Sequence, residues 1–440
     1  MRRQAWLDRA AARAPRRVAV ETQTGSTTYE ELHAAARAGA AELSRTGVKA
    51  GDRVAIALPA GLDFVRALHA CLLLGASAVP VDLRLASGEQ DRVAEGASVR
   101  VEEPLPLDGG EAFSAPGHDL DATALVIHTS GTTAAPRPVE LSYENVLWSA
   151  LGSAVALGVD PEERWLCALP LSHVGGLSIL LRSAIYATTA VVHERFETER
   201  VVHALREERI TLVSLVATTL ARLLDAGLRE PPTLRCALTG GGPVPPALRA
   251  RALESGVPVS LTYGLTETCS QATTLPAAAL TDPGHTAGPP LFCTRLRLAA
   301  DREIMLAGPT VARSAALQDG WLATGDLGRL DERGWLQVAG RKADTIVSGG
   351  ENVAPAEVEG VLEAYPGVVE AAVVGRPHEE WGEMVAAWVV TAPGTHLDWD
   401  ELLAHCRERL APYKVPKAFH GTTEPLPRTP SGKLLRRELA

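Results

Sequence analysis

Apolar residues recur along the chain in two spacings, one typical of helices and one typical of buried strands. Residues 32–43 carry apolar side chains at helical spacing and follow Thr28-Tyr29-Glu30-Glu31, which has the pattern of a capping box. Short apolar runs such as Ala124-Leu125-Val126-Ile127-His128 are typical of buried strands. The chain therefore predicts strands that alternate with amphipathic helices.

This alternation runs from residue 50 to 82 and again from 120 to 262. Strands are predicted at 53–58, 78–81, 124–128, 165–169, 189–193, 211–216, 235–239 and 257–262, with helices at 63–74, 142–156, 176–186, 198–209, 218–226 and 246–254. The order indicates an α/β fold of mostly parallel sheets covered by helices. Residues 87–119 have no clear pattern and are interpreted as irregular surface structure.

The pattern changes after about residue 290. Alternating runs at 296–306 and 321–338 predict antiparallel hairpins, which would form a small barrel-like β part. A small α+β unit is predicted next, with helices at 357–363 and 399–410 and strands at 368–374, 384–391 and near Phe419. We expect a large domain over 1–340, a hinge at 341–344, and a small mobile C-terminal domain over 345–440.

Composition narrows the class of protein. The 440 residues are 46% hydrophobic and carry a net charge of -10, which does not indicate a nucleic-acid partner. Six scattered cysteines without a C-x-x-C pair predict neither a disulfide framework nor a zinc site. The apolar stretch 67–81 is shorter than a membrane span, and no signal peptide is recognised. We expect a cytoplasmic protein and leave open whether it forms homo-oligomers.

Three loops that follow predicted strands carry candidate chemistry. Thr129-Ser130-Gly131-Thr132-Thr133 is interpreted as a turn between a strand and a helix capped by Ser142, and its hydroxyls and N–H groups suit phosphates. A plain polar loop is the alternative, and the spacing is not that of a Walker A loop. Gly240-Gly241-Gly242 and Tyr263-Gly264-Leu265-Thr266-Glu267 follow later strands, where parallel sheets bind ligands. Three glycines admit a flat ring, Tyr263 can stack on it, and Glu267 offers an oxygen ligand to Mg²⁺.

Three further motifs lie in the last third of the chain. Thr324-Gly325-Asp326 presents a carboxylate suited to ribose hydroxyls, Gly340-Arg341-Lys342-Ala343-Asp344 lies at the expected domain joint, and Pro430-Ser431-Gly432-Lys433 ends near the C-terminus. Taken together with the earlier loops, this order of motifs resembles the adenylate-forming superfamily of acyl-CoA ligases, luciferases and adenylation domains, over nearly all of the chain.

The resemblance implies a two-step reaction. A carboxylic acid and ATP give acyl-AMP and pyrophosphate, and a thiol, here that of coenzyme A, then displaces AMP. It implies catalytic roles for Lys433, Glu267 and His173, with Glu267 on Mg²⁺, and substrate contacts for His173, Arg182 and Gly264. The nucleotide and coenzyme A would be bound by Thr129, Ser130, Gly131, Thr132, Thr133, Arg137, Gly240, Gly241, Gly242, Tyr263, Gly264, Thr266, Asp326, Arg341, Ser348, Gly349 and Gly350.

The sequence departs from the superfamily pattern in two places. The phosphate loop usually continues Gly-x-Pro-Lys-Gly, whereas this chain has Ala134-Ala135-Pro136-Arg137-Pro138. Arg137 keeps the positive charge, but Ala134 and Pro138 restrict the backbone. Ala343 stands at the joint where many relatives carry Asp or Lys. We expect these differences to affect how efficiently the loop binds phosphate and which residue is the hinge, rather than the type of reaction.

The acid is suggested by the stretch 169–196. Leu169-Pro170-Leu171-Ser172-His173 and the residues after it resemble bacterial 2-succinylbenzoate–CoA ligases of menaquinone synthesis. Arg182, nine residues after His173 on the same predicted helix, is the candidate for binding the second carboxylate; a solvated helix face is the alternative. Two other functions stay open: activation of another aromatic or short acid, with transfer to coenzyme A or a carrier protein, and a nucleotide-binding relative with degraded catalysis.

Overall fold

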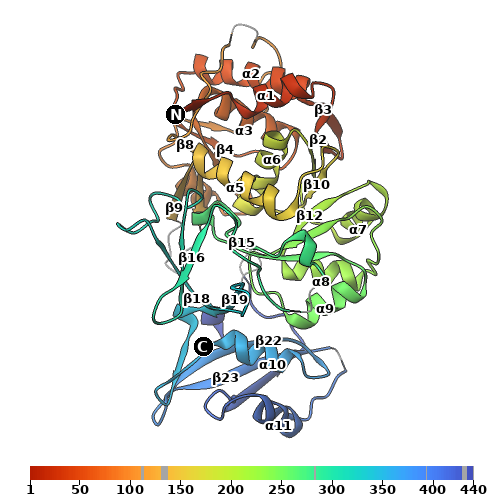
Figure 1. The fold of residues 1–440 in the computed structure, drawn as a ribbon, viewed down its shortest axis with the longest axis vertical. Coiled ribbons are helices and arrows are strands. Elements are labelled where there is room, and N and C mark those ends of the chain that lie inside the picture. Colours follow the sequence, from red (N-terminus) through yellow and green to blue (C-terminus); the bar gives the residue numbers. More distant parts are fainter. Residues whose placement is uncertain (111–112, 130–136, 282–283, 393, 429–433, 440) are drawn as a thin grey trace.

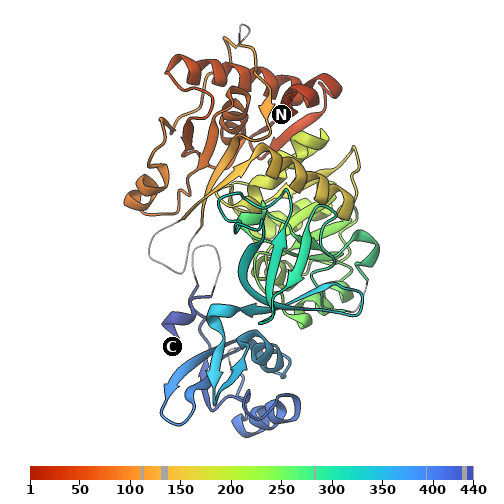
Figure 2. The same ribbon diagram turned by 60° about the vertical axis from the view of Figure 1, so that its left-hand side comes forward.

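The chain folds into a large unit and a small C-terminal unit, which lie one above the other in Figure 1. The computed structural model describes residues 1–110, 113–129, 137–281, 284–392, 394–428 and 434–439. Figure 2 shows the small unit next to the antiparallel strands of the large one. The predicted α/β class is confirmed, because two largely parallel sheets form the body of the large unit.

The first sheet has eight strands in the order β15-β14-β13-β12-β10-β11-β2-β3, of which the six central ones are parallel. The strands are β2 (Val18–Thr22), β3 (Gly25–Thr28), β10 (Arg164–Cys167), β11 (Thr189–Val192), β12 (Leu212–Leu215), β13 (Cys236–Thr239), β14 (Val259–Tyr263) and β15 (Thr273–Thr274).

The second sheet has five strands in the order β6-β4-β5-β8-β9, and its last strand is antiparallel. The strands are β4 (Arg53–Ile56), β5 (Ser77–Pro80), β6 (Val99–Val101), β8 (Thr123–Thr129) and β9 (Arg137–Ser142). The interpretation of residues 129–133 as part of a strand-to-helix turn is wrong, because β9 intervenes before the helix. Val139 and Leu141 alternate with exposed Glu140, so this short segment buries one face as a strand.

Helices cover both sheets and fill the space between them. The helices are α1 (Trp6–Arg13), α2 (Tyr29–Arg45), α3 (Leu62–Leu74), α4 (Ser87–Ala94), α5 (Tyr143–Leu157), α6 (Val174–Tyr186), α7 (Thr198–Glu207), α8 (Ala217–Asp225) and α9 (Pro246–Glu254). The largest core cluster joins α2, α3, α5 and α6 to strands of both sheets, and α7 to α9 pack on the other face of the eight-stranded sheet.

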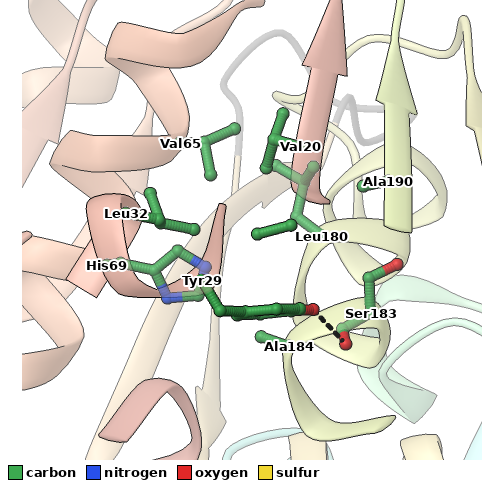
Figure 3. Close-up of a pocket in the computed structure, with 10 residues that line it drawn as sticks. Val20, Tyr29, Leu32, Val65, His69, Leu180, Ser183, Ala184 and Ala190 are labelled. Atoms are coloured by element: carbon green, nitrogen blue, oxygen red, sulfur yellow. Dashed lines mark hydrogen bonds between the residues drawn. The ribbon is translucent and has the colours of Figure 1, made fainter. Parts of the chain in front are cut away.

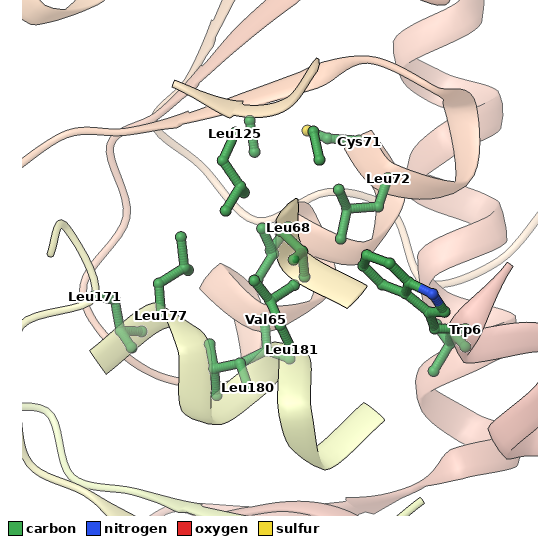
Figure 4. Packing of buried hydrophobic residues seen from close by; sticks show 14 of the residues in the cluster. Trp6, Val65, Leu68, Cys71, Leu72, Leu125, Leu171, Leu177, Leu180 and Leu181 are labelled. Atoms are coloured by element: carbon green, nitrogen blue, oxygen red, sulfur yellow. The ribbon is translucent and has the colours of Figure 1, made fainter. Parts of the chain in front are cut away.

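The apolar stretch 67–81 belongs to this core. Leu68 and Leu72 of α3 pack near Leu177 and Leu181 of α6 (Figure 4). Ten of the thirteen residues of α3 are buried, which explains a hydrophobic run that resembles a membrane segment in composition. Among the described residues, no helix is long and apolar enough to cross a membrane.

Residues 87–119 are more ordered than the sequence indicated. They contain α4, β6 and a short strand β7 (His118–Asp119), which pairs with β1 (Arg2–Arg3). The helix α4 buries only Val93, and its first turn is capped by the Glu89 carboxylate, which accepts a hydrogen bond from the Ala86 N–H. With one buried residue, the helix leaves no periodic apolar pattern in the sequence.

The last third of the chain contains one antiparallel sheet and one mixed sheet, in which β24 pairs with β23 in parallel. The predicted hairpins form a four-stranded sheet of β16 (Arg295–Leu298), β17 (Glu303–Ala307), β18 (Leu322–Leu330) and β19 (Leu336–Arg341). The small unit contains β20 (Ile346–Ser348), β21 (Glu351–Val353), α10 (Pro355–Glu363), β22 (Val368–His378), β23 (Gly382–Thr391), α11 (Trp399–Arg409) and β24 (Ala418–Thr422). Of the expected hinge residues 341–344, Arg341 ends β19, and Lys342–Asp344 form a single turn, η3, before β20.

Candidate active site

The structure brings Tyr263, Asp326 and Arg341 together at one corner of the large unit. Tyr263 ends β14, and its hydroxyl donates to Asp326 Oδ2 at 2.7 Å. Arg341 ends β19, and its Nε lies 2.8 Å from Asp326 Oδ1. Burial and the nearby Asp326 carboxylate raise the pKa of Tyr263, so the hydroxyl keeps its proton. The carboxylate is therefore held by a guanidinium and a hydroxyl and lies next to an aromatic ring, as binding of a nucleoside would require.

The glycine loops lie at the carboxyl ends of adjacent parallel strands, β13 and β14. Gly241 has a φ of +77°, a conformation that favours glycine, and both Gly241 and Gly242 are exposed. Only glycine fits at position 264, because a Cβ atom there would lie 1.6 Å from the Ser270 carbonyl oxygen. The exposed glycines leave backbone accessible to a flat ligand beside Tyr263.

Thr266 and Glu267 begin the turn η1 (Thr266–Thr268), which β9 contacts. The Glu267 backbone oxygen accepts a hydrogen bond from the Ala312 N–H at 2.7 Å, which fixes the position of this residue. Among the described residues, no basic group lies within 4.0 Å of its half-buried carboxylate. A positioned carboxylate without a cationic partner fits the donor chemistry of a Mg²⁺ site. Among the described residues, no three or more His, Cys, Asp or Glu side chains are grouped so that they could hold a metal ion.

Only the two ends of the hydroxyl-rich loop lie within the described residues. Thr129 and Arg137 face each other at the last pair of the β8–β9 hairpin, where the Thr129 hydroxyl donates to the Arg137 carbonyl at 3.3 Å. Arg137 is exposed. Ser130, Gly131, Thr132 and Thr133 lie outside the described residues, and so does Lys433.

His173 lies at the amino end of α6, on the loop that follows β10. Burial lowers the pKa of its imidazole, and Nε2 has no hydrogen-bond partner among the described residues. The preceding Ser172 hydroxyl donates to Asp82 Oδ2 at 3.1 Å. Burial alone would raise the pKa of Asp82, but hydrogen bonds from the Arg84 side chain and backbone bring it down to about 2. An ionised Asp82 thus anchors the loop, and His173 stays neutral and available to a ligand.

Arg182 is buried within α6 with only 2% of its surface exposed, which excludes a solvated helix face. One guanidinium nitrogen donates to the Ser149 hydroxyl at 3.1 Å, and the group lies 5.6 Å from the centre of the Trp165 ring. No carboxylate among the described residues lies within 4.0 Å of it. His173 is the N-cap residue of α6 and has extended backbone, so it precedes the helix that contains Arg182.

A small cavity next to Arg182 connects it to the Glu267 segment. Ser149, Ser178 and Cys269 line this cavity together with apolar side chains. The Ser149 hydroxyl donates to the Cys269 carbonyl at 2.6 Å, and Cys269 directly follows η1. Arg182 is therefore a buried cation behind the segment that carries Glu267, and burial lowers its pKa.

Ser149 was not identified from the sequence. Asn145, Ser149 and Ser153 recur every four residues on the buried face of α5, each less than 5% exposed. A repeat of small polar residues on an otherwise apolar helix face is the signal that could have revealed this contact, because buried polar groups need partners.

Gly349 and Gly350 form the turn between β20 and β21, and Ser348 is the last residue of β20. Both glycines have positive φ, +61° and +85°, as a two-residue hairpin turn requires. The Gly349 N–H donates to the Trp381 carbonyl at 2.9 Å, which attaches the turn to the β22–β23 hairpin of the small unit. Along the chain, these residues and the Tyr263–Asp326–Arg341 corner lie on opposite sides of Ala343.

Comparisons with known proteins agree with this arrangement. Residues 7–102 and 89–314 match the family model of the AMP-binding enzymes, and residues 357–433 match that of the AMP-binding enzyme C-terminal domain. The chain is 38% identical to a 2-succinylbenzoate–CoA ligase of Bacillus subtilis (strain 168), with 99% of this chain and 97% of the relative covered.

Two solved structures of the Bacillus subtilis O-succinylbenzoate coenzyme A synthetase differ in their likeness to this chain. The complex with ATP and a magnesium ion gives a TM-score of 0.90 at 37% identity, with all of both chains covered. A double mutant bound to a product analogue gives 0.72 at 38% identity, with 100% of this chain and 98% of that chain covered. The overall structure of this chain is thus more similar to that of the ATP complex than to that of the double mutant.

Proposed function

The chain belongs to the AMP-binding enzyme family, and we propose that it is an AMP-forming ligase that joins 2-succinylbenzoate to coenzyme A in menaquinone synthesis. The full-length similarity to 2-succinylbenzoate–CoA ligases carries this proposal. A buried arginine without a carboxylate partner in the described residues adds support, because the acid keeps one anionic group after the other is activated.

In the first step, one oxygen of the substrate carboxylate attacks the α-phosphorus of ATP, and pyrophosphate leaves. Two anions must approach each other, so the main requirement is electrostatic. We assign Asp326 and Arg341 to the ribose, Tyr263 and Gly240 to Gly242 to the adenine, and Arg137 with the hydroxyl-rich loop to the phosphates. Glu267 would hold Mg²⁺, which neutralises phosphate charge when bound. Lys433 would bridge the carboxylate and the α-phosphate.

In the second step, the thiol of coenzyme A attacks the acyl carbon, and AMP leaves. The small unit would turn about residues 341–344, so that the Ser348-Gly349-Gly350 turn faces the adenylate and replaces Lys433. A β-hairpin turn attached to Trp381 is rigid enough to move with the small unit as one body. His173, neutral and buried at the start of α6, would close the acyl pocket on the side of the entering thiol.

A panel of acids tests the proposed function. Pyrophosphate release is measured with ATP, Mg²⁺ and each acid, and the thioester formed with coenzyme A is identified by mass. The proposal expects 2-succinylbenzoate to give the highest kcat/KM. A higher kcat/KM for another aromatic or short acid would overturn the proposed substrate but not the proposed ligase activity. If no acid gave pyrophosphate release, a relative with degraded catalysis would be favoured.

Binding provides a second test that needs no turnover. Because a bound anion would neutralise Arg182, 2-succinylbenzoate should raise the Tm of the protein more than benzoate at equal concentration. An equal rise in Tm with both acids would mean that the second carboxylate does not contribute to binding. As part of the same proposal, we place the enzyme in the cytoplasm, where ATP and coenzyme A are available.

A further inference from the structure

Lys342 is attached to the large unit immediately before Ala343. Its ammonium nitrogen lies 2.6 Å from Asp301 Oδ2 and 2.8 Å from Glu303 Oε2. The side chain of Asp301 is half exposed, whereas that of Glu303 is only 13% exposed. Since exposed pairs are weakened by solvent and by the mobility of their side chains, Glu303 is the firmer of the two contacts.

The other oxygen of Glu303 holds the segment of β18 that carries Asp326. Glu303 Oε1 accepts a hydrogen bond from the Gly325 N–H at 2.9 Å. Gly325 has a φ of +70° and directly precedes Asp326 in the chain. One carboxylate therefore connects the residue before Ala343 to the backbone of the Tyr263–Asp326–Arg341 corner.

Asp344, immediately after Ala343, is attached to the small unit instead. Its Oδ2 lies 3.3 Å from Arg436 Nε. Arg436 also donates to both oxygens of Glu359 on α10, at 2.6 and 3.0 Å, and Glu359 accepts from the Val373 N–H at 2.7 Å. Lys342 is thus bound to the large unit and Asp344 to the small unit. Ala343, the one residue between them in the chain, connects the two units.

We propose that Glu303 is a positioning residue for the two-step reaction: it keeps Lys342 on the large unit, confines the rotation between units to Ala343, and links this pivot to the segment of β18 that carries Asp326. The inference rests on the proposed function, because only a reaction with two arrangements of the small unit needs a defined pivot. Without the Glu303 charge, rotation spreads to Lys342, and the arrangement for the first step is less well defined.

Glu303→Gln tests this inference, because glutamine keeps a carbonyl oxygen for the Gly325 N–H and removes the charge that attracts Lys342. The matched control is Glu357→Gln, which removes a lysine pair of similar length, 2.6 Å to Lys414, within the small unit. Glu303→Gln should slow adenylate formation about tenfold and leave thioester formation from preformed acyl-AMP within about twofold. The control should change neither. Equal losses in both steps, or the same split in the control, would overturn the proposal.

Trypsin gives a readout that does not depend on catalysis. Cleavage after Lys342 releases residues 343–440, and its rate is followed by the mass of that fragment. Glu303→Gln should speed this cleavage several-fold, because a released lysine and hinge are easier for the protease to engage, and Glu357→Gln should not. An unchanged rate would show that Glu303 does not hold the hinge. If the parent forms no adenylate from 2-succinylbenzoate, the proposed substrate fails, and the cleavage rates still decide the role of Glu303.

Discussion

The hydroxyl of Tyr263 donates to the carboxylate of Asp326 at 2.7 Å, although 63 residues separate them in the chain. Because the ring and the carboxylate come from different sheets, the contact defines the position of each relative to the other. We predict that Tyr263→Phe, which keeps the ring, raises the KM for ATP about fivefold, the equivalent of one ordinary hydrogen bond.

Asp326→Ala should have a larger effect, because hydrogen bonds to a charged group are stronger than those between neutral groups. Loss of two of them should lower kcat/KM for ATP by about 100-fold or more. Pyrophosphate release at varied ATP and saturating acid measures both variants. A change in the KM for the acid, with that for ATP unaltered, would exclude a role for this corner in nucleotide binding.

Lys433 should serve the first half-reaction. Lys433→Ala removes a charge that acts mainly as negative charge redistributes in the transition state, so adenylate formation should fall by orders of magnitude. Supplied with preformed acyl-AMP and coenzyme A, the variant should still form thioester. Comparable losses in both half-reactions would contradict the assignment.

Much of the fold could be predicted because its amphipathic helices bury one face and its central strands are short, fully buried runs. The strand at 124–128 and the helix at 142–156 correspond to β8 and α5, and Ser142 caps that helix as expected. The strand β9 was missed because only Val139 and Leu141 show its alternation and Pro138 argues against a strand. Local pattern therefore fails where an element is short or buries little.

The site was predicted less completely than the fold, since its contacts are long-range. Motif spacing brought Tyr263 and Asp326 into one hypothesis, but no local pattern could show that Arg341 pairs with Asp326 or that Glu303 holds Lys342. For Arg182 the helix was predicted correctly, but the sequence left a solvated helix face open as an alternative. Only the packing of α5 and α6 decides that this arginine points into the interior, toward Ser149.

Arg182 should determine selectivity for an acid with two carboxylates. Arg182→Met keeps the packing against Trp165 and removes the charge, so kcat/KM for 2-succinylbenzoate should fall about 100-fold. Activity on plain benzoate, which lacks the second anion, should change only a few-fold. Arg182→Lys is the charge-conserving control and should lie between the parent and Arg182→Met. Equal losses on both acids in Arg182→Met would mean that the arginine is structural.

His69 should make the stability of the protein sensitive to mild acid. Its ring lies on α3 in a small pocket lined by Tyr29, Val65, Leu180 and Ser183, shown in Figure 3. Burial lowers the pKa of His69 to about 4, so the native state keeps this imidazole neutral. The unfolded chain, with a histidine pKa of about 6.5, binds a proton that the native state does not. The free energy of unfolding must therefore fall as the pH drops from about 6.5 to 4.

The size of this effect can be isolated with His69→Leu, which has no proton to bind. The difference in the free energy of unfolding between parent and variant, measured in urea, should shift by about 2 kcal/mol between pH 7.5 and pH 5, because the pKa of His69 lies well below 5 in the native state. At pH 5 the free energy of unfolding of the parent should be lower, relative to that of His69→Leu, than it is at pH 7.5. Val65→Ala, in the same pocket, alters packing without altering titration, and its cost should be the same at both pH values. A parent-to-His69→Leu difference that stays constant with pH would mean that the native state accepts the proton.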